Sequence, residues 1–424
     1  SGTIGNNIGR HSGSIAVTAA GLSWDTAVVT ASTVTVEAGN GYWINTTSNA
    51  CTITLPASAE AGDQIVLVDY ARTWGTNKII IDSNGLNFQG NDDTYTVEYT
   101  TDGQSVNIVY SDSTKGWLPL EDDVVADEPV APTTHKAIFA YGHAGGATGK
   151  ISLKNLVNSS GVVAADATGV GTARNGLAAT GYGFDKAIFA YGDDRDATNV
   201  SISNLVSNSG VVASDTTGVG TARNYLAAAI YGRDKGIFAY GLTDAVSSLS
   251  NLVSNSGVIA SDVTGVGTAR RSLAAVSYGG DKAIFGYGYT SSNVSMTNLV
   301  SNSGVIATDV SGVGTDRRDL AAASYGSGGT ALFAFGYTSS GVSLKNLVTS
   351  AGVVGSDVTG VGTARWSLAA AIYGGDKAIF AYGNSGSRTA ISNLVNSSGV
   401  VAADVSGVGT AREGIAAAGY SATA

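Results

Sequence analysis

Three polar residues recur at nearly constant spacing along most of the chain, and this periodicity constrains the fold more than any other feature. The repeated arginines are Arg174, Arg223, Arg270, Arg317, Arg365 and Arg412, separated by 49, 47, 47, 48 and 47 residues. The repeated asparagines are Asn155, Asn204, Asn251, Asn298, Asn346 and Asn393, and the repeated aspartates are Asp166, Asp215, Asp262, Asp309, Asp357 and Asp404. Because the three series stay in step, they indicate six tandem copies of one supersecondary unit.

Each copy contains four short apolar segments separated by Gly, Ser, Asn and Asp, as at 273–278, 282–288, 294–300 and 305–309. This pattern predicts a four-stranded antiparallel sheet per copy. A period near 47 residues is typical of a propeller blade and is about twice that of a solenoid coil. The 58 glycines exclude helical repeats.

The second segment of each copy is apolar on both sides, as in KAIFAYG at 136–142. A strand of this kind must be covered on both faces, and a blade stacked between two other blades supplies that cover. The first segment is rich in alanine, as in LAAAIY at 226–231, which suits a crowded position near a central axis. We therefore expect a six-bladed β-propeller.

The first copy begins at its second strand, whereas the chain ends with a spare first strand at 414–420. We predict that 415–420 pairs with 137–141, which closes the ring and leaves no long unpaired edge. The predicted repeats are 136–185, 186–234, 235–281, 282–329, 330–376 and 377–424.

The order of the TAR string, the small-residue strand, the GGDKAIF string and the following Gly resembles that of kelch repeats. The resemblance covers residues 136–424. It departs from the kelch pattern where Tyr-Gly, as at Tyr287 and Gly288, replaces the double glycine, and where the outer strand lacks its aromatic residue. It therefore implies the blade architecture and not kelch-type partners.

Residues 22–120 also show strand patterns, and we expect an all-β chain with a β-sandwich-like module in this region. The expected strands are 33–37, 51–55, 64–68, 78–81, 95–99 and 106–110. Residues 121–135 are acidic, contain Pro129 and Pro132, and are predicted to be a linker. Residues 1–21 are expected to be irregular.

The strings LPASAEAGD, DYARTWGTN and DGQSVNIVY lie within this front module. Together they are similar to a β module in the tail fibres of tailed phages, particularly marine ones. The resemblance implies an extracellular fibre or adsorption protein on the virion surface. Its partners would be other tail or head proteins and a bacterial surface glycan or receptor, and three copies would assemble.

No pattern of catalytic or cofactor-binding residues occurs, and we expect neither enzymatic activity nor a cofactor. His11, His135 and His143 lie near no Cys or acidic residue at metal-ligand spacing, and the single Cys51 is expected to be a small core residue. With a net charge of −10 and no Lys/Arg cluster, neither nucleic acid nor an anionic membrane is an expected partner, and no apolar run long enough for membrane insertion occurs.

The repeated Asp and Arg admit two interpretations. They could form an anion-binding ring, but a polar residue present once per blade more commonly satisfies turn or inter-blade backbone groups, and we favour this structural role. A glycan depolymerase would need a pair of carboxylates. Asp193, Asp194, Asp196 and Asp319 qualify by position only, and we expect them to be solvated loop charges.

Comparison of the copies predicts one variable face. The first and third turns are uniform, whereas the second turns and the links after the repeated Arg differ between copies, and in a four-stranded blade both variable sets reach the same face. We predict a binding role for Asn175, Tyr225, Arg271, Tyr289, Arg318, Asp319, Tyr337, Trp366 and Glu413. A structural virion spacer or decoration protein and a bacterial adhesin are the alternatives to a receptor-binding protein.

Overall fold

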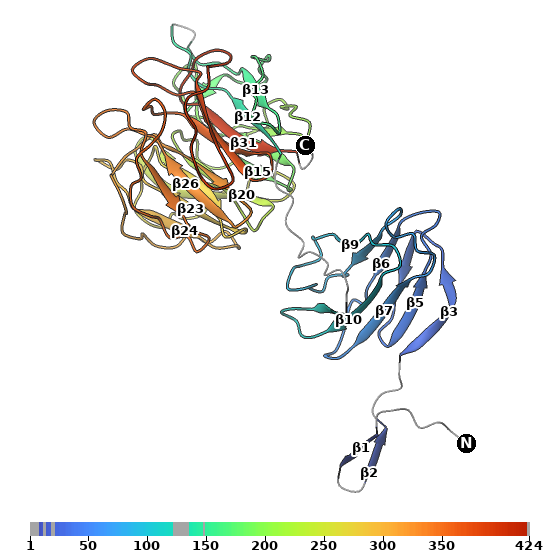
Figure 1. The fold of residues 1–424 in the computed structure, drawn as a ribbon. Helices are drawn as coiled ribbons and strands as arrows, with labels where there is room; N and C mark the ends of the chain where they lie inside the picture. Colours follow the sequence, from blue (N-terminus) through green and yellow to red (C-terminus); the bar gives the residue numbers. More distant parts are fainter. Residues whose placement is uncertain (1–7, 12–13, 18–21, 122–134, 147–148, 422–424) are drawn as a thin grey trace. The chain divides into compact units, whose positions relative to one another are not determined.

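The computed structural model describes residues 8–11, 14–17, 22–121, 135–146 and 149–421 of the chain. Every regular element in these residues is a β-strand, so the expectation of an all-β chain is confirmed. No membrane-crossing helix occurs among them. The chain divides into two compact units, Ser1–Ala131 and Pro132–Ala424 (Figure 1). The division falls within the predicted linker, whose residues 122–134 lie outside the described residues.

Nine strands of the first unit form two sheets, and β1 (Ile8–His11) pairs with β2 (Ser14–Val17) as a separate hairpin. That hairpin lies in the segment expected to be irregular, the rest of which lies outside the described residues. The five-stranded sheet has the order β11 (Trp117–Glu121), β10 (Ser105–Tyr110), β7 (Gln64–Asp69), β5 (Asn40–Ile44) and β3 (Ser23–Val29). The four-stranded sheet has the order β4 (Thr33–Thr35), β6 (Cys51–Thr54), β8 (Ile79–Asp82) and β9 (Val97–Tyr99).

From β3 to β8 the chain alternates between these two sheets, so successive turns of the chain lie side by side as parallel strands. β3 pairs parallel with β5 and β5 with β7 in one sheet, while β4 pairs with β6 and β6 with β8 in the other. The six expected strands are present within a few residues, but β3, β5 and β11 were not predicted. The result is two facing sheets wound as a coil.

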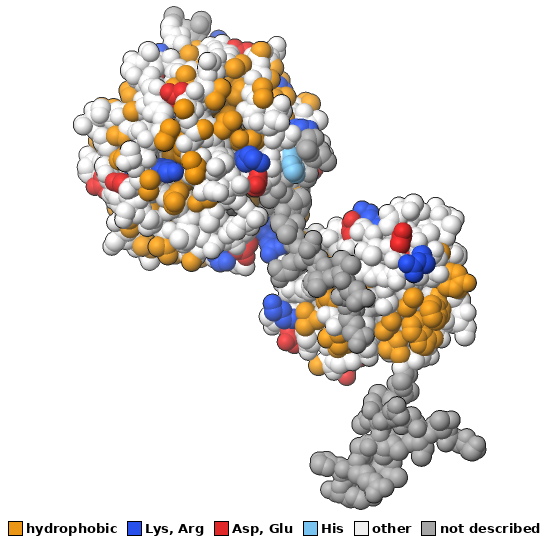
Figure 2. Space-filling view, in the orientation of Figure 1, with side chains coloured by type: hydrophobic (Ala, Val, Ile, Leu, Met, Phe, Trp, Pro, Cys, Tyr) orange, Lys and Arg blue, Asp and Glu red, His pale blue; other side chains and the backbone are white. Residues whose placement is uncertain are grey.

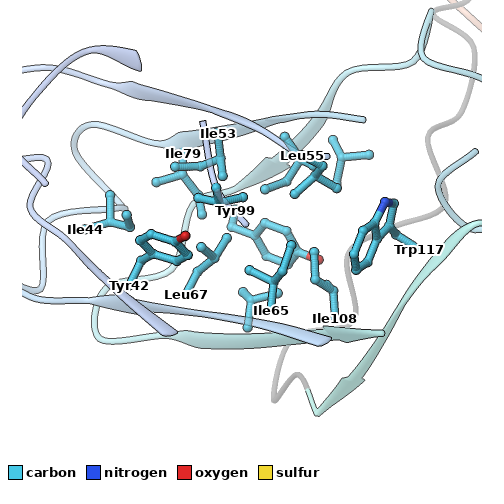
Figure 3. Packing of buried hydrophobic residues seen from close by; sticks show 14 of the residues in the cluster. Tyr42, Ile44, Ile53, Leu55, Ile65, Leu67, Ile79, Tyr99, Ile108 and Trp117 are labelled. Atoms are coloured by element: carbon cyan, nitrogen blue, oxygen red, sulfur yellow. The ribbon is translucent and has the colours of Figure 1, made fainter. Parts of the chain in front are cut away.

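Side chains that alternate along these strands fill the space between the two sheets. Figure 3 shows Ile53 and Ile79 of the smaller sheet facing Ile65 and Leu67 of the larger one. Cys51 is fully buried in the same core, as expected, and its burial raises the pKa of its thiol to about 11.

The second unit consists mainly of six three-stranded antiparallel sheets built from the repeats. Each has an inner, a middle and an outer strand. In chain order of their middle strands, the sheets are β31 (Ala416–Tyr420), β12 (Lys136–Ala140) and β13 (Lys154–Val157); β15 (Ala178–Tyr182), β16 (Lys186–Ala190) and β18 (Ser203–Val206); β19 (Ala227–Tyr231), β20 (Lys235–Leu242) and β21 (Val246–Val253); β22 (Ala274–Tyr278), β23 (Lys282–Gly286) and β24 (Thr297–Val300); β25 (Ala321–Tyr325), β26 (Thr330–Ala334) and β27 (Lys345–Val348); and β28 (Ala369–Tyr373), β29 (Lys377–Ala381) and β30 (Ser392–Val395).

The expectation of four regular strands per copy is wrong, because the fourth segment makes only isolated bridges to the outer strand. In the fourth sheet these bridges are Val300↔Ile306 and Thr297↔Val310. Between them the side chain of Asn298 donates a hydrogen bond to the Ala307 carbonyl (3.0 Å). A side-chain amide thus takes a place that a backbone N–H would take in a continuous ladder, and the regular strand ends there.

The last strand completes the first sheet, as predicted. β31 pairs with β12 in antiparallel register from Lys136↔Tyr420 to Ala140↔Ala416, and Figure 1 shows the two strands side by side, β12 in teal and β31 in red. Where the other five sheets have a turn between the inner and middle strands, this sheet has two separate chain segments, joined by a hydrogen bond from His135 N to Ser421 O (2.7 Å).

Two closed cycles of backbone hydrogen bonds join the six sheets, one at each end of the inner strands. The first runs through the residue two positions after each repeated Arg, from Gly176 to Gly414, Ser367, Asp319, Ser272, Tyr225 and back to Gly176, at 2.7 to 2.9 Å. The second runs through the opposite turns, in the bonds Gly183→Asp234, Gly232→Asp281, Gly279→Gly329, Gly326→Asp376, Gly374→His135 and Ser421→Asp185. Each inner strand also contacts the inner strands of two other sheets.

The repeated Arg is a fully buried link within and between sheets. Arg270 donates hydrogen bonds to the carbonyls of Tyr287 (2.9 Å) and Thr268 (3.1 Å) and to Asn298 Oδ1 (2.7 Å). Its guanidinium group lies 4.3 Å from the ring centroid of Tyr240 in the preceding sheet. Each of the three guanidinium nitrogens thereby donates to the scaffold, and the structural interpretation of the Arg and Asn series is confirmed.

The repeated Asp ties the loop before each Arg to the sheet. Asp309 accepts hydrogen bonds from the backbone N–H (3.0 Å) and the hydroxyl (2.6 Å) of Thr268 and from the Asn298 amide (2.9 Å), and it lies 4.0 Å from Arg270. Partial burial acts to raise the pKa of this carboxyl, but the hydrogen bonds from Thr268 and Asn298 and the nearby Arg270 charge outweigh it and lower the pKa. The Asp series is therefore also structural.

Candidate binding face

The two variable sets of the repeat meet at one end of the inner strands. The first residue after each repeated Arg bridges to the first residue of a second turn, in the pairs Glu413↔His143, Asn175↔Asp193, Asn224↔Leu242, Arg271↔Tyr289, Arg318↔Tyr337 and Trp366↔Asn384. The pair Asn175↔Asp193 belongs to the short strands β14 (Arg174–Asn175) and β17 (Asp193–Asp194). We call the surface formed by these pairs and by the first hydrogen-bond cycle the variable face.

A small pocket of about 70 Å³ lies at the centre of the variable face. Its wall alternates between the residues of the hydrogen-bond cycle and the residues that follow them, which are five leucines and Ile415. All six cycle residues have a positive φ; two are glycines, and the other four are Tyr225 (50°), Ser272 (55°), Asp319 (54°) and Ser367 (51°). A left-handed backbone costs a non-glycine residue roughly 1 kcal/mol, so four side chains are held here against the backbone preference.

Aromatic rings and guanidinium groups alternate around one half of the variable face. Arg271 lies 5.8 Å from the ring centroid of Tyr225 and 5.2 Å from that of Tyr289. Arg318 follows, at 4.8 Å from Tyr289 and 4.9 Å from Tyr337. We call this series, with Trp366 at its far end, the stacked arc.

Trp366 ends the stacked arc. Its ring centroid lies 5.1 Å from that of Tyr337, with the rings nearly perpendicular. One side of the indole is packed on Gly341, where a Cβ would lie 3.0 Å from the ring, and the side chain remains half-buried. A partly exposed indole held in this way is a rigid apolar contact surface.

The other half of the variable face carries charged and polar groups. Arg388 pairs with Glu413 (2.8 Å) and hydrogen bonds to His143 Nδ1 (2.8 Å), while Asn384 donates to the second Glu413 oxygen (2.7 Å). Burial, and then the Arg388 charge, lower the pKa of His143. We call this group the polar arc.

The polar arc continues at the Lys150–Asp193 ion pair, in which the Lys150 ammonium also donates to the Asp194 carbonyl (2.5 Å). The remaining oxygen of Asp193 is buried and accepts no hydrogen bond from a described residue, as is true of Oδ1 of Asn175 and of Asn224. Two cations of this arc are therefore neutralised by carboxylates, and three buried oxygens accept no hydrogen bond from a described residue.

The four aspartates considered for a depolymerase were expected to be solvated loop charges instead, and for two of them this is wrong. Only 14% of the Asp193 side chain and 18% of the Asp319 side chain are exposed, because each lies against a neighbouring cation. Burial raises the pKa of Asp319 despite the opposing effects of its Ser272 hydrogen bond and of the Arg318 and Arg271 charges. Asp194 accepts the backbone N–H groups of Asp196 (3.0 Å) and Thr198 (3.1 Å), which shapes its turn.

The structure brings most of the predicted binding residues together. Tyr225, Arg271, Tyr289, Arg318, Tyr337 and Trp366 form the stacked arc, Asp319 lies 3.3 Å from Arg318, and Glu413 and Asn175 lie beside the polar arc. Residues that were not predicted are His143, Lys150, Asn224, Asn384 and Arg388. His143, Asn384 and Arg388 lie in the variable second turns, Lys150 directly follows one, and Asn224 occupies the position of Asn175, so the repeat alignment already contained the signal.

The described residues contain no group of three His, Cys, Asp or Glu side chains that could hold a metal ion. In the front unit, the strings DYARTWGTN and DGQSVNIVY contain residues with scaffold roles. Asp69 accepts the N–H groups of Thr73 (3.1 Å), Trp74 (3.2 Å) and Gly103 (2.9 Å), which ties two of those strings together. No protein-family model matches the chain, and no curated protein matches its sequence.

Proposed function

We propose that the chain is a virion surface fibre or adsorption protein of a tailed phage, and that its variable face recognises a bacterial surface glycan or protein. In this proposal residues 136–424 form a six-bladed, kelch-like β-propeller closed by β31. The two closed hydrogen-bond cycles and the β12–β31 pairing support the propeller. The likeness of the front module to phage fibres supports the virion location, the homotrimer and the attachment to other virion proteins.

The binding role rests on one observation: the variable face keeps side chains where the backbone favours glycine. Gly176 and Gly414 occupy two of the six left-handed positions, which shows that the scaffold needs no side chain there. Tyr225, Asp319 and the two serines occupy the others at a cost of roughly 1 kcal/mol each. The same conformation occurs in every repeat at a buried aromatic residue of the scaffold, such as Tyr287, but there each repeat keeps the side chain. At the cycle positions two repeats have glycine, and the side chains of the other four lie beside the stacked arc.

The residues that join the first and last segments of the repeats lie away from the variable face. His135 and Ser421 belong to the second hydrogen-bond cycle, at the opposite end of the inner strands. We propose binding without catalysis and without a cofactor.

The test compares adsorption of the purified full-length chain to cells of a susceptible bacterium, found by screening strains. Tyr225→Gly places at this position the residue that two other repeats use, so it removes the ring without straining the backbone. We expect this variant and Trp366→Ala to lose adsorption while their melting temperatures stay within a few degrees of wild type. Lys282→Ala, in a turn at the opposite end with 45% of its side chain exposed, is the control. Unchanged adsorption by both arc variants would disprove the proposal.

A further inference from the structure

We infer that the variable face binds an anionic glycan, and that Arg271 is the residue that recognises its carboxylate or sulfate groups. This inference rests on the proposed function and specifies its ligand. Both groups are anions with several oxygen atoms attached to a sugar ring; the carboxylate is planar and the sulfate is tetrahedral.

Arg271 differs from Arg318 and Arg388 in having no carboxylate within ion-pair distance. Arg318 lies 3.3 Å from Asp319 and donates to Asn293 (3.3 Å), while Arg388 pairs with Glu413. Within the described residues, Arg271 makes no ion pair and donates no side-chain hydrogen bond; it contacts two aromatic rings, and its charge acts on Asp319 without a direct ion pair. Its guanidinium donors are therefore available to an anionic group of a ligand.

The two rings hold the Arg271 guanidinium in place before any ligand arrives. Tyr225 and Tyr289 lie at 5.8 and 5.2 Å, so the group is positioned by cation–π contacts that leave its N–H donors free. A guanidinium fork matches the two oxygens of a carboxylate or sulfate and binds them with two parallel hydrogen bonds. A preordered fork also loses less conformational entropy on binding.

The surroundings of Arg271 favour a sugar as the carrier of the charge. Tyr289, Tyr337 and Trp366 continue the stacked arc beside it, and all three are half-buried. Aromatic rings that are apolar in the middle and polar at one edge suit the C–H faces and hydroxyl groups of sugar rings. Figure 2 shows hydrophobic and other uncharged side chains over most of the surface that it presents, with scattered Lys, Arg, Asp and Glu side chains.

The experiment measures binding of the full-length chain to three soluble probes by calorimetry: oligogalacturonate, its fully methyl-esterified form, and a sulfated dextran oligosaccharide. We expect wild type to bind one of the two anionic probes about tenfold or more tightly than the neutral ester, the gain of a charge-assisted bidentate contact. A preference for oligogalacturonate identifies carboxylate as the source, and a preference for the sulfated probe identifies sulfate.

Arg271→Gln should abolish that preference, whereas Lys282→Gln, at an exposed cation at the opposite end of the inner strands, should retain it. Trp366→Ala should weaken binding of the charged and neutral uronate probes by a similar factor. Equal affinity of wild type for charged and neutral probes, no detectable binding of either anionic probe, or an unchanged preference in Arg271→Gln overturns the inference. If Tyr225→Gly still abolishes cell adsorption in that case, the proposed function survives with a different ligand.

Discussion

Tyr287 and its counterparts show how one residue can serve both a sheet and its neighbour. Tyr287 has a φ of 63° and Gly288 one of 111°, a combination that ends the middle strand and turns the Tyr287 carbonyl toward Arg270. The ring contacts Phe333 of the next sheet at 5.2 Å, and its hydroxyl donates to the Val313 carbonyl (3.1 Å). The Tyr-Gly that departs from the kelch pattern thus positions both the Arg and the inter-sheet contact.

One repeat provides a natural test of the hydroxyl, because Phe335 occupies the position of Tyr287. We predict that Tyr287→Phe lowers the free energy of unfolding by about 1 kcal/mol, since the Val313 carbonyl loses its donor. Phe335→Tyr should raise it by a similar or smaller amount. Urea denaturation of both variants checks the prediction, and the same sign of change in both would contradict it.

At this scale the sequence predicted which residues matter better than it predicted what they contact. The Arg, Asn and Asp series and most of the stacked arc were visible in the repeat alignment. The difference between Arg271 and Arg318 was not, because it depends on Asp319 and Asn293 making direct contacts with Arg318 and not with Arg271. Such contacts join separate repeats, and spacing along the chain does not encode them.

At the scale of the element, the loops before the repeated Arg depend on ionised aspartates. Asp166, Asp215, Asp262, Asp309, Asp357 and Asp404 all have a lowered pKa. A carboxyl whose folded-state pKa is depressed stabilises the fold above its unfolded value of 3.8, and this contribution is lost as the pH falls through the folded value.

We therefore predict that the six aspartates contribute stability that is fully present above about pH 5 and is lost steeply below the ordinary Asp pKa. Thermal unfolding from pH 7 to pH 3 measures it. Asp309→Asn should lower the melting temperature at pH 7 and reduce the further loss on acidification, because one of the six titrating groups is gone. An identical pH profile for the variant would show that Asp309 contributes nothing to the effect.

The strand predictions were confirmed where a strand is an apolar segment bounded by turns. They were wrong where a side chain takes the place of a backbone pairing partner. The inner and middle strands follow from apolar segments bounded by turns. The fourth segment has the same apolar character, but Asn298 binds its Ala307 carbonyl and breaks the ladder. In the front unit the strand runs were mostly found, yet the coil of parallel strands was not, because pairing between successive turns of a coil is non-local.

β31 is the element on which closure depends. Removing residues 415–424 should expose the edge of β12 and remove the bonds through Ser421 in the second hydrogen-bond cycle. We predict a large fall in melting temperature and aggregation of the truncated chain, measured by light scattering during heating. Removing 422–424 alone is the control, since β31 remains. A truncated chain that melts as the intact one does would show that β31 is dispensable.

At the scale of the whole repeat unit, the first and last segments of the repeats meet in one sheet, and we call this junction the seam. Its position depends on where in the repeat the chain begins, and not on a difference between the six sheets. Five sheets have a turn between the inner and middle strands, and in the sixth His135 and Ser421 meet there at 2.7 Å. If the six sheets are equivalent, any of these turns can serve as the seam. A circular permutant tests this directly.

The permutant joins residue 421 to residue 135 with a short glycine-containing turn and opens the chain between Gly328 and Gly329. Gly328 is a suitable opening because no atom lies within 4 Å of where its Cβ would be. We predict that the permuted repeat unit folds with a melting temperature within a few degrees of the unpermuted unit, because every strand keeps its partners. The matched control is a second permutant that is opened at one peptide bond within the paired strands β22 and β23. This opening should destabilise the repeat unit severely. If both permutants fail to fold, the native seam has a role in folding that the equivalence of the sheets does not explain.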